Sequence, residues 1–208
     1  MVSCSELSLQ QFSEDLFSRA PTPGGGCAAA LTGALSVSLG AMAANLTVGK
    51  KKYASVEDRL RGAIASCDEL RRRFLELIDE DAAAFEPLSR AYSLPKDAEN
   101  YAARLREATL SASRPPLKMM RTCAECIELL EELSSCCSPL VISDVACGAS
   151  LAGAALASAA LNVFVNTRTL RGDAEADAME EEGKRLLSVY RPRAEAIVLS
   201  VQNTLLEG

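Results

Sequence analysis

The sequence predicts an all-α protein, an antiparallel helical bundle that forms a single domain over residues 1–208. Three observations predict this class. Alanine, leucine and glutamate are abundant, whereas aromatic residues make up 4% of the chain and tryptophan is absent. Two long runs, 20–49 and 145–167, contain no charged residue and are rich in alanine, glycine and serine. Elsewhere, apolar residues recur at the spacing of an amphipathic helix.

The N-terminal region predicts one short helix. Residues 8–11, with the sequence Ser-Leu-Gln-Gln, have the pattern of a capping box. The apolar side of this helix would be formed by four residues, Leu9, Phe12, Leu16 and Phe17. Residues 20–26 are expected to form the loop that follows.

Residues 27–48 predict an uncharged helix that ends near Gly49. One face of it carries only small residues, which let another backbone approach closely: Gly33, Ser36, Gly40 and Ala44. We expect this face to pack on the second small-residue helix, or on its mate in a homodimer. The run is long enough to cross a membrane. Its hydroxyl and amide side chains, and the lack of an aromatic belt, favour a buried helix of a soluble protein.

A second capping pattern, at residues 55–58, predicts a long helix that runs to about Phe85. Pro87 is expected to kink or end it. A polar helix would follow over about 97–112.

The remaining helices are separated by clear breakers. Residues 114–116, Arg-Pro-Pro, predict a break before a helix over about 116–134. The second small-residue helix is expected over about 145–170 and the last helix over about 173–205, with a kink near Pro192.

Composition limits the function. The net charge is −6 and lysine and arginine are scattered, so we expect no nucleic-acid partner. The chain has no histidine, which excludes Ser-His-Asp triads, Cys-His pairs and histidine-bound metals. Proton transfer would fall to Asp, Glu, Lys, Tyr or Cys. Eight cysteines without a secretory signal predict free thiols and a cytoplasmic protein.

The long helix over 55–85 carries the sharpest chemical signal. Its apolar stripe consists of Leu70, Phe74, Leu77, Ala84 and Leu88, and Asp81 lies in the same stripe. Asp79 and Glu80 are turned away from Asp81 by about 200° and 100°. A carboxylate in an apolar stripe is costly unless it is partnered or lines a cavity. Its position therefore indicates either a structural partner or a proton-handling group with a raised pKa.

Two further motifs flank the first small-residue helix. Gly24, Gly25 and Gly26 give a backbone that can form a structural loop or lie directly against a ligand. Lys50, Lys51 and Lys52 are either a solvated helix end or a docking site for an anionic tail.

Polar residues near the second small-residue helix also allow two interpretations. Asp144 has the position of a helix cap, and it could also hold the edge of a guanidine-like ring. Asn162 and Asn166 lie four residues apart, so they face the same way as a buried amide pair or as pocket lining. The cysteines at 123, 126, 136 and 137 lack ordinary zinc-ligand spacing, and we expect neither a metal nor a bound cofactor.

Taken together, an ordered set of motifs resembles one family. It is the cyclodeaminase domain of formiminotransferase-cyclodeaminase, together with the stand-alone methenyltetrahydrofolate cyclohydrolases. The resemblance covers nearly the whole chain, in the family's order. It is carried by Pro23-Gly24-Gly25-Gly26, Asn45-Leu46-Thr47-Val48-Gly49-Lys50-Lys51-Lys52-Tyr53, Leu77-Ile78-Asp79-Glu80-Asp81-Ala82-Ala83-Ala84-Phe85, Leu94-Pro95-Lys96, Ser143-Asp144 and Asn162-Val163-Phe164-Val165-Asn166.

The resemblance implies a homodimer that acts on the one-carbon bridge of a tetrahydrofolate derivative, with Asp81 as the catalytic acid/base. The residues expected to bind the folate are Gly24, Gly25, Gly26, Asn45, Lys50, Lys51, Lys52, Asp144, Asn162 and Asn166. The lysines would suit the glutamate tail of a polyglutamylated folate. The chain departs from the family at two places. Cys27 stands where the family usually has Ser, and Cys137-Ser138-Pro139 stands where many members have a Gly-Asn element.

Two hypotheses from different classes follow. In the first, the protein hydrolyses methenyltetrahydrofolate or deaminates formiminotetrahydrofolate, and the sequence does not decide between these two substrates. In the second, it is a catalytically silent helical dimer that binds folate or a partner enzyme. The position of Asp81 on an apolar stripe favours the first hypothesis.

Overall fold

The computed structural model describes residues 3–97 and 99–207, and the secondary structure within these ranges is helical, as the sequence predicts. Four short 3₁₀ turns accompany six α-helices. The α-helices are α1 (Leu9–Phe17), α2 (Gly25–Asn45), α3 (Glu57–Tyr92), α4 (Tyr101–Cys136), α5 (Ile142–Thr167) and α6 (Ala174–Glu207).

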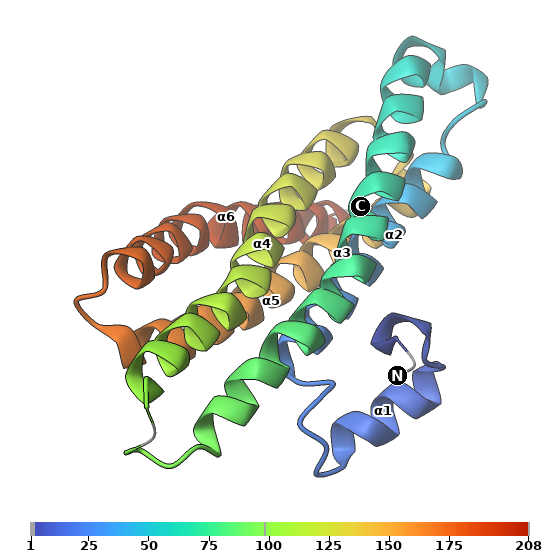
Figure 1. The fold of residues 1–208 in the computed structure, drawn as a ribbon. Helices are drawn as coiled ribbons and strands as arrows, with labels where there is room; N and C mark the ends of the chain where they lie inside the picture. The colour runs from blue at the N-terminus through green and yellow to red at the C-terminus, as the bar shows by residue number, and fades with distance from the viewer. Residues whose placement is uncertain (1–2, 98, 208) are drawn as a thin grey trace.

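Helix α2 packs mainly against α3 and α5 (Figure 1). It contacts α3, α4 and α5, while α6 packs outside against α4 and α5. The connection between α2 and α3 lies at one end of the bundle, and the connection between α3 and α4 lies at the other. Helix α1 stands beside the half of α3 nearest that second connection.

Small residues of α2 bring the neighbouring helices close. A Cβ atom at Gly33 would lie 2.4 Å from the Phe74 ring of α3. The Ser36 hydroxyl donates to the Gly148 carbonyl of α5 at 2.8 Å. The whole predicted face, Gly33, Ser36, Gly40 and Ala44, is buried within one chain. The expectation that α2 packs on the second small-residue helix is confirmed, and the expectation that this face forms a dimer contact is wrong.

Helix α4 is continuous where the sequence predicts two helices with a break at residues 114–116. Pro116 lacks the N–H that would bond the carbonyl of Ala112, four residues earlier. Asn166 of α5 donates to that carbonyl from Nδ2 at 3.3 Å. A partner from another helix therefore replaces the missing bond, and the helix continues.

Helix α3 also differs from its prediction at both ends. It continues through Pro87 to Tyr92 instead of ending near Phe85. It begins at Glu57, after a 3₁₀ turn, and its N-cap makes no side-chain bond. The Glu57 carboxylate instead accepts the Gly49 N–H at 2.8 Å, so it binds the preceding turn rather than a capping serine.

Three smaller corrections concern helix starts and faces. The Ser8 cap is confirmed, because its hydroxyl accepts the Gln11 N–H, but only Phe12 of the predicted α1 stripe is buried and Phe17 is 95% exposed. Helix α2 begins at Gly25, so part of the predicted glycine loop is helical. Helix α5 begins before Asp144, which lies in the first turn and is not the cap.

Two segments, Gly25–Asn45 and Pro139–Leu170, are long and apolar enough to cross a membrane by length and composition. In their most apolar windows, 56% and 39% of the residues are buried. Helices α2 and α5 pack against each other and contribute to the main hydrophobic core.

Candidate active site

Asp81 lies where α3 meets the N-terminus of α2. The predicted stripe is present: Leu70, Phe74, Leu77 and Leu88 are buried, and Asp81 is half-buried between the last two. Its carboxylate contacts the glycine run, because a Cβ atom at Gly26 would lie 2.3 Å from Oδ2. Any side chain at position 26 would displace the carboxylate, so this close approach requires glycine.

The first turn of α2 needs outside partners, because the first N–H groups of a helix have no carbonyl within it. Gly24 is the N-cap and supplies no side-chain bond. The Cys27 backbone N–H faces the Asp81 carboxylate and lowers the pKa of that carboxyl. The Cys27 thiol also donates to Oδ2 of Asp81 at 3.5 Å. The Asp81 carboxylate of α3 thus lies at the N-terminus of α2, where the helix dipole favours a negative charge.

Burial and hydrogen bonding act in opposite directions on this carboxyl. Burial raises the pKa of Asp81, and the hydrogen bonds from the thiol and the backbone of Cys27 offset only part of the rise. Asp81 therefore holds its proton to a higher pH than an exposed aspartate does. Such a group is suited to accept and return a proton.

Asn162 of α5 lies at the same end of α2. A Cβ atom at Gly25 would be 3.5 Å from its Nδ2, which donates to the Ser158 carbonyl at 2.8 Å. Asn166, one turn later, donates to the Ala112 carbonyl. The two amides therefore do not pair with each other. Asn162 lies beside the glycine run, and Asn166 joins α5 to α4.

Asp79, two residues before Asp81, has a role that the sequence analysis missed. Its Oδ2 accepts from the hydroxyls of Ser3 at 2.5 Å and Ser5 at 2.7 Å. Burial raises the pKa of Asp79, but these bonds outweigh it and hold the pKa below its ordinary value. Asp79 is thus an anion that ties the N-terminal segment to α3. It borders a cavity of about 500 Å³ that Asp81 does not line.

The other predicted binding residues lie far from Asp81 in the same chain. Helix α2 has 21 residues and separates the glycine run from the exposed Lys50–Lys52 by about 30 Å. Asn45 is exposed at the lysine end and donates to the carbonyl of its own helix at residue 41. Asp144 lies 18 residues before Asn162 on α5, a rise of about 27 Å. One chain therefore brings together only part of the predicted site.

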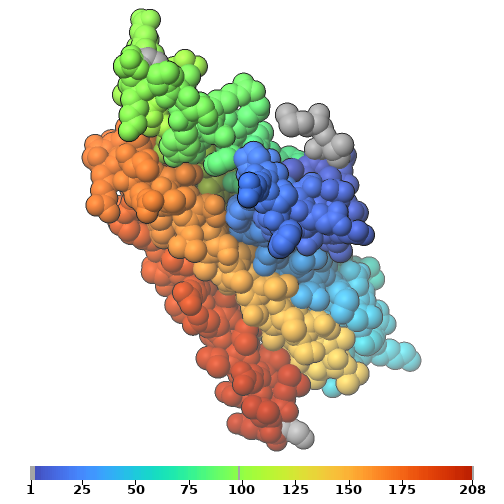
Figure 2. All heavy atoms as spheres, turned by 90° about the horizontal axis from the view of Figure 1, so that it is seen from below, coloured from blue at the N-terminus to red at the C-terminus, as the bar shows by residue number. Residues whose placement is uncertain are grey.

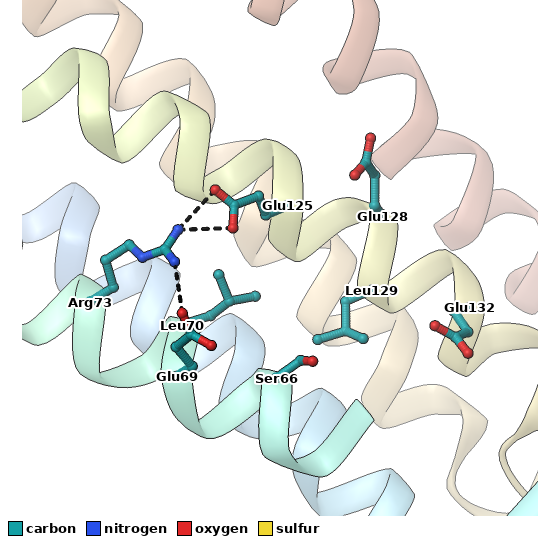
Figure 3. Close-up of a pocket in the computed structure, with 8 residues that line it drawn as sticks. All are labelled: Ser66, Glu69, Leu70, Arg73, Glu125, Glu128, Leu129 and Glu132. Carbon is teal, nitrogen blue, oxygen red and sulfur yellow. Dashed lines mark hydrogen bonds and ion pairs between the residues drawn. The ribbon is translucent and has the colours of Figure 1, made fainter. Parts of the chain in front are cut away.

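A groove between α3 and α4 contains none of the predicted site residues (Figure 3). Its volume is about 310 Å³, and its walls carry Glu69, Glu125, Glu128, Glu132 and Arg73. Arg73 donates to both carboxylate oxygens of Glu125 at 2.8 Å, and to Glu69 at 3.1 Å. The remaining excess of carboxylates disfavours an anionic ligand here.

The cysteines form neither a disulfide nor a metal site within the described ranges. All eight are free thiols. No three Cys, Asp or Glu side chains of residues 3–97 and 99–207 are grouped to hold a metal ion. Burial raises the pKa of Cys126 to about 12, so this thiol stays protonated.

Comparison with known proteins adds to this picture. A sequence model of the formiminotransferase-cyclodeaminase family matches residues 8–185, which include Asp81, the glycine run, Cys27 and Asn162. The methenyltetrahydrofolate cyclohydrolase of Methylorubrum extorquens is 40% identical over 87% of this chain and 89% of its own length. The formimidoyltransferase-cyclodeaminase of Sus scrofa is 29% identical over 92% of this chain, which spans only 36% of that protein.

A solved structure is similar as well. The crystal structure of formiminotetrahydrofolate cyclodeaminase from Thermotoga maritima matches with a TM-score of 0.83 and 27% identity. The match covers 94% of this chain and 98% of that one. The similarity therefore extends over the whole bundle.

Proposed function

The chain belongs to the formiminotransferase-cyclodeaminase family, and from this premise we propose that it is an enzyme acting on the one-carbon bridge of a tetrahydrofolate derivative. The observation that carries the proposal is the half-buried Asp81 carboxylate, held against the N-terminus of α2 in a chain without histidine. Asp81 is the group that we propose for proton transfer.

The proposed chemistry needs one such group. In a cyclohydrolase reaction, water attacks the cationic methenyl carbon. In a cyclodeaminase reaction, a folate nitrogen attacks the formimino carbon and ammonia leaves. Both reactions pass through a tetrahedral carbon between two nitrogens. Asp81 would take a proton from the attacking group and return it to the departing nitrogen, and its anion would stabilise the cationic amidinium.

Methenyltetrahydrofolate is the substrate that we propose first. The relative that carries the cyclohydrolase name is 40% identical and nearly the same length. Formiminotetrahydrofolate is the second candidate, supported by the likeness to the Thermotoga maritima cyclodeaminase.

A turnover assay with purified protein and both folates tests this proposal. Asp81→Asn keeps the shape of the side chain and removes its titratable proton, so kcat should fall by about 10²- to 10⁴-fold. Asp79→Asn is the matched control, because that carboxylate binds Ser3 and Ser5 and points elsewhere. Turnover of neither substrate would favour the silent binding module. Normal kcat in the Asp81→Asn protein would remove Asp81 from the mechanism.

The second copy in a homodimer is the partner that we propose for the exposed apolar face of α2 and α5. This face includes Leu35, Met42, Leu46, Leu161 and Val165, which are between 43% and 68% exposed. Figure 2 shows α5, the yellow-to-orange band, at the surface next to α2. Apart from Asp144, neither helix carries a charge. Exposed apolar side chains on two neighbouring uncharged helices are typical of an interaction site.

The predicted binding residues lie at opposite ends of α2 in one chain, which supports a second copy of the chain as the partner on this face. A two-fold axis through this face and perpendicular to α2 would set the two α2 helices antiparallel. The partner's lysine end would then lie near Asp81, and its Lys50–Lys52 run could hold the glutamate tail of the folate. Free thiols throughout the chain are consistent with the cytoplasmic location that we propose.

Mixed dimers test whether the site is shared. Co-expressed Asp81→Asn and Lys50→Gln/Lys51→Gln/Lys52→Gln chains would form one intact and one doubly defective site if the lysines serve the partner. The mixture should then show a wild-type KM for polyglutamylated folate in part of its activity. Lysines that serve their own chain would give only the raised KM. A monomer by light scattering would overturn the dimer itself.

A further inference from the structure

The Cys27 thiol is the feature next to Asp81 that the reaction described above does not use. Its side chain is completely buried. The thiol lies 3.5 Å from Oδ2 of Asp81 and 3.4 Å from the carbonyl oxygen of Ile78, three residues earlier on α3. One S–H group therefore faces two acceptors, and it can donate to only one at a time.

The thiol acts here as a hydrogen-bond donor. Burial raises the pKa of Cys27 to about 12, so the sulfur keeps its proton and is not a nucleophile at physiological pH. Cys27 lies in the first turn of α2 and is buried, which fixes the position of the sulfur beside Asp81. Position 26 has no side chain that could separate the two groups.

We propose that Cys27 is a positioning residue for Asp81, and that its thiol exchanges between two acceptors as Asp81 gains and loses its proton. When Asp81 is an anion, the S–H donates to Oδ2 and holds the carboxylate against the N-terminus of α2. When Asp81 is protonated, the S–H turns to the Ile78 carbonyl. This inference rests on the proposed function of Asp81 as the proton-transfer group.

The surroundings contain few other groups that titrate. Asp81 itself comes from α3, and the only titratable side chain that acts on its carboxyl among the described residues is Cys27 of α2. The N-terminal turn contributes Cys4, which acts on the Cys27 thiol. Helix α5 contributes the neutral amide of Asn162 next to Gly25. A change in the hydrogen bonding of the Cys27 thiol should therefore shift the pKa of Asp81.

The kinetic experiment is the pH dependence of kcat for two variants. Cys27→Ser replaces a weak hydrogen-bond donor with a stronger one and should favour the Asp81 anion. The inflection of the pH–kcat curve that reports Asp81 should therefore move to lower pH. Cys27→Ala removes the donor and should move the same inflection to higher pH. Each shift should correspond to about a 2- to 10-fold change in the acid constant. Cys126→Ser is the control, because this buried thiol contacts Ser36 and not Asp81.

An infrared experiment tests the thiol without turnover. The S–H stretching band that disappears in Cys27→Ala should move to lower frequency as the pH rises through the Asp81 titration. It should stay fixed in Asp81→Asn. An S–H band whose frequency does not change with pH would overturn the proposal. So would Cys27→Ser and Cys27→Ala variants that shift the pH–kcat inflection in the same direction, or by no more than Cys126→Ser does. A band that follows Asp81 in a protein without turnover would support the proposed contact and reject the proposed enzyme.

Discussion

The two ends of α2 carry the two halves of the predicted site, and they are built differently. At the glycine end, Asp81 is half-buried and lies against the backbone of α2 at Gly26. At the lysine end, Lys50–Lys52 are exposed, and the ion pairs of the described residues do not involve them. Burial changes the proton affinity of a group, whereas exposed charges act weakly through solvent. The glycine end is thus suited to chemistry and the lysine end to attraction of a charged ligand.

Substitution at Gly26, where Asp81 lies against the backbone, should have the largest effect on the glycine end. Gly26→Ala places a methyl group within 2.4 Å of both carboxylate oxygens of Asp81, which must move. A misplacement of about 1 Å can lower kcat by about 10²-fold, and the crowding should cost about 1–3 kcal/mol of stability. Gly62→Ala, where nothing lies within 4 Å, is the control and should stabilise α3 by about 0.5–1 kcal/mol. Equal kcat values for the two variants would contradict the close approach.

The bond between Asn166 and the Ala112 carbonyl lies one turn of α5 beyond Asn162, the amide next to the glycine run. Asn166→Ala leaves that carbonyl without a partner and should cost about 1–3 kcal/mol in urea unfolding. Pro116→Ala restores the backbone N–H that α4 lacks, so Asn166→Ala should cost much less in that background. The same cost in both backgrounds would mean that the proline is not the reason for this contact.

The pH dependence of the free energy of unfolding tests whether Asp81 is buried as the structure shows. The native pKa of Asp81 is raised above the ordinary value of 3.8, so the native state binds more protons than the unfolded state between these two pKa values. This contribution to stability is complete below the ordinary pKa and is lost as pH rises through the native pKa, with a slope of at most about 1.36 kcal/mol per unit. The free energy of unfolding of Asp81→Asn, relative to wild type, should therefore increase with pH. A flat difference would mean that burial does not shift this carboxyl.

The lysine end should give the smallest effect. Replacement of Lys50, Lys51 and Lys52 with Gln should raise KM for polyglutamylated folate by about 1.5- to 5-fold per lost ion pair. The monoglutamate should be nearly unaffected, and added salt should reproduce the change because exposed pairs are screened within about 8–10 Å. An equal loss on both substrates would place the lysines at the pterin end of the ligand.

Local pattern in the sequence determined much of this protein. Alanine-rich uncharged runs and apolar periodicity predict the helices, and the stripe of α3 selects Asp81 because helical spacing fixes which side chains share a face. The sequence predicts a structural loop or ligand contact at positions 24–26, and in the structure the Asp81 carboxylate lies against Gly26. These inferences succeed because each depends on residues within a few helical turns.

Tertiary structure decided what depends on distant partners. The break predicted at residues 114–116 is absent from α4, and Asn166, 50 residues after Pro116, bonds the carbonyl that Pro116 leaves without a backbone donor. Asp79 is recognised as an anchor only once Ser3 and Ser5 lie beside it. The small-residue face of α2 is filled by Phe74 and bonded to Gly148, which lies 112 residues from Ser36. A helix presents the same face to a neighbour in its own chain or in another, so the sequence of that face alone does not determine which neighbour covers it.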